Sequence, residues 1–216
     1  FITIFFSFGF YYLGKLICNF FKINKLILLI SMPQFQYASI GISTILLILY
    51  PLVFLDLINI FFLKFLSYLI LIIGIIFSFL NIKKFNFFFL KLFKLARYNI
   101  YYQYVLLLVT LYLLLSLSPI TDSDSLAYHL NIGKFILNNG NFPFQTHTYS
   151  NALAGAGELL ISLSLFVKAE QFGSFVNFIG LVSIIGIIIN FSKNININFS
   201  LLNLLLVLSC PILVFL

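Results

Sequence analysis

The chain has 216 residues, of which 62% are hydrophobic and 8% are charged, and its mean hydropathy is +1.16. Soluble domains are about 45–50% apolar and about 25% charged, so this composition excludes a water-soluble globular protein. The net charge of +7 comes from basic residues scattered through apolar sequence, which excludes a nucleic-acid-binding protein and leaves a polytopic membrane protein.

Apolar segments of roughly the 20 residues that a membrane-spanning helix needs recur along the chain. In order they are residues 1–18, 38–56, 61–80, 100–118 and 172–191. A sixth, residues 199–216, reaches the last residue, and the sequence starts on Phe1, so we expect a piece of a longer protein. Unpaired backbone groups cannot face lipid, and these segments show no alternation of apolar and polar residues. We therefore predict an all-α bundle of transmembrane helices.

The cations lie in alternate loops, which predicts the orientation in the membrane. Lysines surround the first loop, residues 83–97 carry five cations, and Lys193 follows the fifth segment, so these parts are expected on the cytoplasmic side. Residues 119–171 carry only Lys134 and Lys168 and are expected outside. Residues 83–97 are also rich in Phe and Leu, which predicts a basic amphipathic helix along the cytoplasmic membrane surface.

Most of the acidic residues lie in the long outer loop. The chain has five acids, and the loop holds four of them: Asp122, Asp124, Glu158 and Glu170. A carboxylate beside an apolar membrane surface is costly, which indicates a function. Simpler roles remain open, because either aspartate can cap a helix, Glu158 can offset a helix dipole, and Glu170 can pair with Lys168. The Asp-x-Asp pattern can also bind a divalent cation.

Two helices are predicted within this loop. Residues 125–137 follow a capping run and end at Asn138-Asn139-Gly140, a C-terminal signal. On this helix Tyr128 shares the face of Asp124, while His129 lies about 140° away. Residues 158–167 are apolar but too short to cross the membrane, which predicts a re-entrant or surface-lying helix beginning with Glu158.

Three sequence motifs lie between one predicted span and the next. They are Asp122-Ser-Asp-Ser-Leu-Ala-Tyr128-His129-Leu130, Lys134-Phe-Ile-Leu-Asn-Asn-Gly140 and Gly157-Glu158-Leu159-Leu160. This order resembles the C-type membrane glycosyltransferases, which use polyprenyl-phosphate sugars. The three motifs look most like those of the bacterial branch that is similar to dolichyl-phosphate-mannose protein mannosyltransferases. The resemblance covers residues 100–191. We therefore divide the chain into N-terminal transmembrane helices, residues 1–99, and the start of a glycosyltransferase-like core, residues 100–216, whose extracytoplasmic loop spans 118–171.

The resemblance implies an enzyme of the bacterial inner membrane that moves a sugar from a polyprenyl-phosphate donor to a lipid, glycan or protein acceptor. It places the general base, which deprotonates the acceptor hydroxyl, on Asp124, with Asp122 as partner or substitute. Substrate-binding roles fall on Tyr128, His129, Lys134 and Glu158. The departing phosphate needs a cation, for which Lys134 and His129 are the candidates. Some members of the superfamily use a divalent cation, which Asp122 and Asp124 would hold.

Two other functions remain open. A transporter or flippase would need ionisable residues or helix-breaking Gly and Pro near the bilayer midplane. A non-catalytic scaffold of envelope polysaccharide assembly would keep the fold without the activity. Ser125, which stands where the family pattern has a second acid, and the absence of a late Pro-Pro-Leu favour the scaffold.

Overall fold

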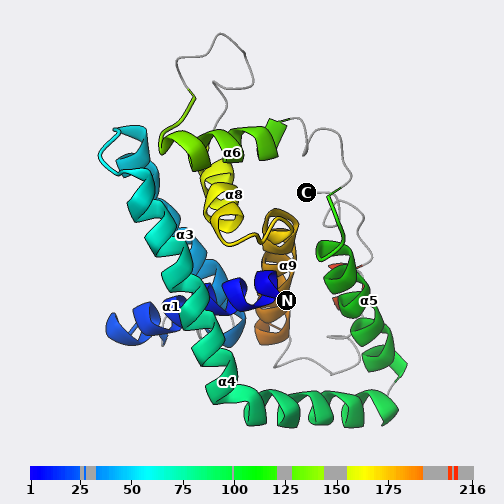
Figure 1. Ribbon diagram of the computed structural model, residues 1–216. Coiled ribbons are helices and arrows are strands. Elements are labelled where there is room, and N and C mark those ends of the chain that lie inside the picture. The colour runs from blue at the N-terminus through cyan, green and yellow to red at the C-terminus, as the bar shows by residue number, and fades with distance from the viewer. Residues whose placement is uncertain are drawn as a thin grey trace.

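The computed structural model describes residues 1–24, 27, 33–98, 100–120, 128–143, 155–191, 204–205 and 207–208, with the backbone alone at 83–98 and 191. Within these ranges every regular element is helical, which confirms the all-α prediction (Figure 1). Most of the predicted sixth segment, residues 199–216, lies outside the described residues.

Four helical stretches in the described part of the chain are long and apolar enough to cross a membrane. They are α1 (Ile2–Phe20), α3 (Pro33–Phe54), residues Ile60–Ile82 of α4 (Ile60–Tyr98) and Phe172–Asn190 of α9 (Phe172–Phe191). The protein is therefore embedded in a membrane by several helices. α5 (Ile100–Ser116), also predicted as a span, is apolar but has 17 residues, just under the length of the other four.

Glycines allow α1 to cross α3 and α4 in direct backbone contact. A Cβ added at Gly74 of α4 would stand 1.8 Å from a backbone oxygen of α1, and one added at Gly14 of α1 would stand 1.8 Å from a backbone oxygen of α3. The facing residues are also glycines, Gly9 and Gly41. Small residues at helix crossings are typical of membrane proteins, because close packing replaces the hydrophobic effect as the driving force.

α9 lies between two parts of the apolar core. On one side Phe172, Phe175 and Ile179 belong to a cluster formed by α1, α3, α4, α6 and α8. On the other side Leu181 and Ile185 pack against α5 and against Leu204 and Leu208. Hydrogen bonds also join α9 to α3, since the Ser39 and Ser183 hydroxyl oxygens are 2.6 Å apart and Gln36 Nε2 donates to the Ser183 carbonyl at 2.9 Å.

α4 is a single helix of 39 residues, about 58 Å long, whereas the bilayer hydrocarbon core is about 30 Å thick. After its membrane-length part it changes direction, and its last part lies crosswise (Figure 1). Near this point Ser78 Oγ donates to the Gly74 carbonyl at 2.7 Å and Asn81 Nδ2 donates to the Phe77 carbonyl at 2.9 Å. Such bonds to the preceding turn bend helices. The helix predicted at residues 83–97 therefore exists as a continuation of the span.

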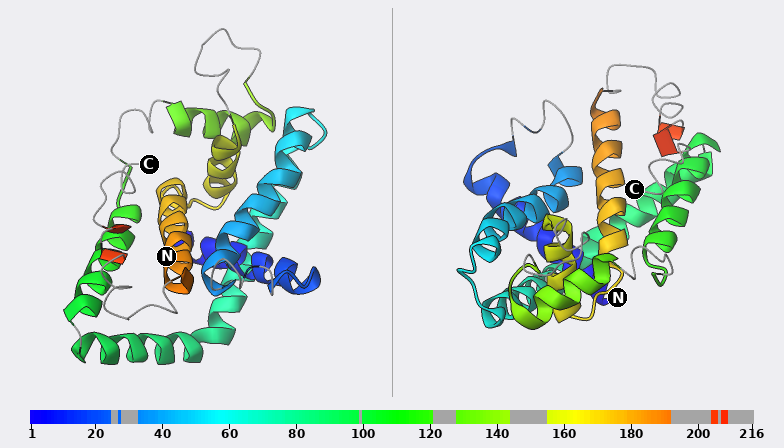
Figure 2. Two further views of the ribbon diagram at one scale, coloured as in Figure 1. Left: turned by 180° about the vertical axis from the view of Figure 1, so that it is seen from behind. Right: turned by 90° about the horizontal axis from the view of Figure 1, so that it is seen from above.

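The crosswise part of α4 and the helices of the predicted outer loop lie at opposite ends of the molecule (Figures 1 and 2). α6 (Leu130–Asn139) lies beside the start of α4, where a Cβ added at Gly140 would stand 3.2 Å from the Ile60 nitrogen. α8 (Ala156–Phe166) lies next to α6 and contacts it. This separation agrees with the alternation of cations along the sequence.

Candidate functional site

The helix that carries His129 ends where the sequence predicts. A π-helical turn at Tyr128 and His129 leads into α6, which ends at Gly140 with a φ of +81°. The Gly140 N–H donates to the Ile136 carbonyl at 2.8 Å. This left-handed conformation is one that glycine adopts without steric cost. The predicted start at residues 125–127 lies outside the described residues.

α8 is a short helix inserted into the bundle. It has 11 residues and begins at Ala156. Glu158 is therefore its third residue, whereas the sequence predicted Glu158 as the first. Leu159 and Leu163 are fully buried, and α8 contacts α3, α4, α6 and α9. Of the two predicted placements, the burial of α8 supports a re-entrant helix more than a surface-lying one. Gly133 of α6 permits the contact with α8, because a Cβ there would stand 2.8 Å from Ile161 Cγ2.

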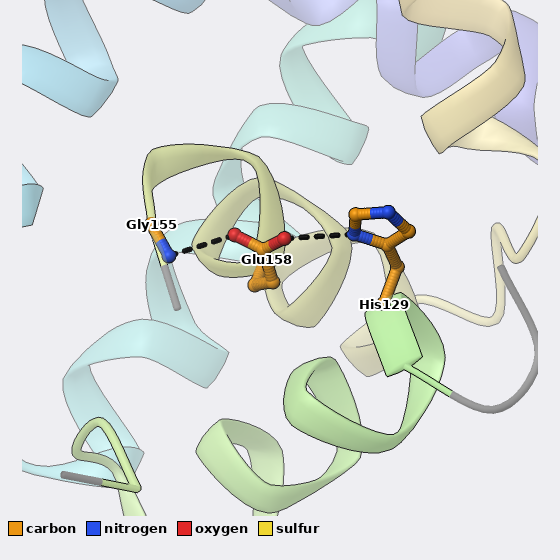
Figure 3. A network of polar contacts seen from close by, with 3 residues as sticks. All are labelled: His129, Gly155 and Glu158. Carbon is orange, nitrogen blue, oxygen red and sulfur yellow. Dashed lines mark hydrogen bonds and ion pairs between the residues drawn. The ribbon is translucent and has the colours of Figure 1, made fainter. Parts of the chain in front are cut away.

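Glu158 is buried and hydrogen-bonded through both carboxylate oxygens (Figure 3). Its Oε2 accepts a hydrogen bond of 2.8 Å from the Gly155 N–H, which satisfies a free donor at the start of α8. Its Oε1 lies 2.8 Å from His129 Nδ1. Glu158 therefore stabilises the start of its own helix and also holds the histidine that directly precedes α6.

The pair determines how His129 presents its ring. When Glu158 is ionised its carboxylate only accepts hydrogen bonds, and His129 Nδ1 is then the donor of the bond between them. The other ring nitrogen, Nε2, points away from the carboxylate (Figure 3). The His129 side chain is 39% exposed, so its ring is reachable from solvent or by a ligand. A histidine held in this way can accept a proton, or donate a hydrogen bond when it is protonated.

His129 and Glu158 line a cavity of about 330 Å³ between α6, α8 and α9. Its other polar residues are Glu170, Ser174 and Asn177, and its apolar residues include Ile120, Leu130, Leu160, Ile161 and Val176. Ligand-binding pockets usually have about 300–1,000 Å³ and combine apolar walls with a few polar groups. The cavity is therefore large enough for part of a small ligand, and it offers both kinds of contact.

The other predicted site residues are placed differently. The Tyr128 ring lies beside the His129 ring, with centroids 4.5 Å apart. Lys134 is exposed on α6 and is not among the residues that line the cavity. Asp122 and Asp124 lie outside the described residues.

Glu170 lines the cavity, and the structure forms no ion pair between it and Lys168, although both residues are described. The simple pairing of these two neighbours was therefore wrong. Lys168 occupies the left-handed turn that ends α8, with a φ of +58°.

Ser174 and Asn177 were not predicted as site residues. Their signal in the sequence is a pair of polar residues three positions apart near the start of a mostly apolar span. This spacing puts both side chains on one helix face. Among the described residues, no group of three or more His, Cys, Asp or Glu side chains is arranged to hold a metal ion. The predicted cation ligands, Asp122 and Asp124, lie outside that part of the chain.

Comparison with known proteins finds one family. The model of the DUF1420 N-terminal domain matches residues 77–216, which is more than half of the chain. The match includes α5, α6, α8 and α9, and so contains every residue that lines the cavity. No curated protein and no solved structure matches the chain.

Proposed function

We propose that this chain, which belongs to the DUF1420 family, is part of a membrane glycosyltransferase that uses a polyprenyl-phosphate sugar as donor. The observation that carries the proposal is the His129–Glu158 pair in the cavity between α6, α8 and α9. A buried carboxylate is costly in an apolar protein, and this one orients a histidine toward a space that a ligand can enter.

The reaction needs two groups from the protein. The acceptor oxygen attacks the anomeric carbon, its proton passes to a base, and the bond to the lipid phosphate breaks with the electron pair leaving on the phosphate. We assign the base to Asp124, with Asp122 as its partner or substitute, from the family resemblance. Ile120, which directly precedes the segment that contains both aspartates, and His129, which follows it, line the cavity.

His129 is the group that we assign to the departing phosphate. When protonated, its Nε2 can donate a hydrogen bond to an anionic phosphate oxygen, and Glu158 offsets the positive charge of the ring. Lys134 was the other candidate for this role, but it does not line the cavity. Tyr128 lies against the His129 ring, which limits how far that ring can rotate.

The cavity also suits a lipid-linked donor. Apolar residues of α8 and α9, such as Leu160 and Val176, line it together with polar Glu158 and Asn177. A polyprenyl phosphate has the same combination, a charged head on an apolar chain. α6, whose first residue Leu130 lines the cavity, lies at the end of the molecule opposite the basic part of α4 (Figure 1). The positive-inside rule then favours the extracytoplasmic side for the cavity, and the family resemblance suggests the bacterial inner membrane.

The test uses the full-length protein in lipid nanodiscs, supplied with labelled polyprenyl-phosphate hexoses and pentoses and with extracted envelope acceptors. We expect the wild-type protein to transfer label, Asp124→Asn to abolish transfer, and His129→Gln to slow it by about 10²–10³-fold. Asp56→Asn is the matched control, because Asp56 is an exposed acid in the turn between α3 and α4. Wild-type protein that binds none of the donors, or Asp124→Asn protein that transfers normally, would contradict the proposal.

A further inference from the structure

The last part of α4 is attached to the membrane at both ends. It continues directly from the membrane-length stretch Ile60–Ile82, and only residue 99 separates it from the apolar helix α5. Its 16 residues, 83–98, form a helix about 24 Å long. Because both neighbouring helices are apolar, this helix cannot extend far into water. Its crosswise direction in Figure 1 agrees with a position along the membrane surface.

The cations of this helix fall on one face. At 100° per residue, all five cations lie within an arc of about 140°. They are Lys83, Lys84, Lys91, Lys94 and Arg97. The middle of the opposite arc holds only apolar residues: Phe85, Phe88, Phe89, Leu92, Phe93, Leu95 and Ala96. This division is typical of helices that lie in the plane of a membrane surface.

Carboxylates of the same chain provide little counter-charge for these cations. The sequence has no acidic residue between Asp56 and Asp122. Of the acids that the structure describes, Asp56 lies in the turn before α4, and Glu158 and Glu170 line the cavity. The turn before α4 and the helix α6, whose Leu130 also lines the cavity, lie at the end of the molecule opposite the crosswise helix (Figure 1). The described acids therefore do not neutralise the cations of residues 83–98, and the counter-charge must come largely from outside the described residues.

We infer that the cationic face of residues 83–98 binds the headgroups of anionic phospholipids in the leaflet at that end of the molecule. The charges are complementary, and the crosswise direction of the helix after a membrane-length stretch agrees with a position among the headgroups. Each Lys or Arg near an anionic surface contributes about 1 kcal/mol, which is about fivefold in affinity. Bound lipid would fix the connection between the first three spans and α5. This inference does not depend on the proposed function.

The test measures retention of phosphatidylglycerol by the full-length protein in detergent, by native mass spectrometry, with phosphatidylcholine as the neutral lipid. We expect preferential retention of phosphatidylglycerol that falls with added salt. Lys91→Gln/Lys94→Gln should bind phosphatidylglycerol about 30-fold more weakly, whereas Lys91→Arg/Lys94→Arg should retain it. Lys64→Gln/Lys168→Gln is the matched control, because it removes the same charge from exposed positions on other segments.

Three results would overturn the inference. The first is wild-type protein that retains both lipids equally or shows no dependence on salt, and this measurement needs no variant. The second is Lys91→Gln/Lys94→Gln protein that retains phosphatidylglycerol as the wild type does. The third is an equal loss in the Lys64→Gln/Lys168→Gln control, which would indicate a general effect of net charge.

Discussion

Removal of the Glu158 carboxylate tests the geometry of the site most closely. Glu158 is 7% exposed and accepts two hydrogen bonds of 2.8 Å, one from the Gly155 N–H and one from His129 Nδ1. Loss of an N-terminal capping bond costs about 1 kcal/mol, and a hydrogen bond that involves a charged group contributes about 1.5–3 kcal/mol. Because His129 is partly exposed, the lower value applies to the pair. Glu158→Ala should therefore lower the free energy of unfolding by about 2–3 kcal/mol.

Glu158→Gln should have a smaller effect and a distinct spectroscopic signature. The amide oxygen can still accept from the Gly155 N–H, while the amide nitrogen donates to His129 Nδ1. The neutral His129 ring then has to carry its proton on Nε2. We expect a loss of about 1 kcal/mol in stability together with a change of tautomer. Histidine ¹⁵N chemical shifts of the protein in nanodiscs measure the tautomer, and denaturant titration measures the stability.

A double-mutant cycle separates the pair from the cap. Glu158→Ala, His129→Ala and the double variant should give a coupling energy of about 1 kcal/mol or more. Glu170→Gln is the control, because Glu170 lines the same cavity but is exposed, and it should change stability by less than about 0.5 kcal/mol. A coupling energy near zero, or an unchanged tautomer in Glu158→Gln, would refute the description of the site.

Three further predictions concern the fold, and each is checked by thermal unfolding in detergent. Gly74→Leu should prevent the close contact of α1 with α4 and destabilise the protein by more than about 3 kcal/mol, whereas Gly180→Leu, where an added Cβ meets nothing within 4 Å, should be tolerated. Gly140→Ala should lower the stability of the protein by about 1–2 kcal/mol because of its φ of +81°. Gly157→Ala should not destabilise the protein, because an added Cβ there meets nothing within 4 Å, and equal effects of the two variants would contradict the strain argument. Ser183→Ala should lose about 0.6 kcal/mol with the bond to Ser39, and no further loss should follow when Ser39→Ala is added.

Local signals in the sequence predicted those features, such as helix ends, that depend only on residues close together in the chain. The end of α6 follows from Asn138-Asn139-Gly140, and the start of α8 was placed within two residues because an acid precedes an apolar run. The membrane-length helices followed from length and composition alone. The continuity of α4 past residue 82 did not follow from length and composition. The lysines at 83 and 84 interrupt the apolar pattern without interrupting backbone hydrogen bonding.

Contacts between distant segments could not be predicted in the same way. His129 and Glu158 were both singled out, but their direct bond joins residues 29 positions apart and depends on the packing of α6 on α8 at Gly133. Ser174 and Asn177 could not be predicted as site residues, because a mostly apolar segment with a few polar residues still has the composition of a span. The aspartates of the predicted catalytic motif, Asp122 and Asp124, lie outside the described residues, and their role stays a prediction.

Photocrosslinking tests the central claim, that the cavity holds a polyprenyl-phosphate sugar, most directly. A photoreactive amino acid at Val176, which lines the cavity, is compared in the full-length protein with one at Leu47, which is 76% exposed on α3. With a labelled polyprenyl-phosphate sugar we expect crosslinking at position 176 that unlabelled donor displaces, and little at position 47. Equal crosslinking at both positions, or label at 176 that excess donor does not displace, would contradict the claim.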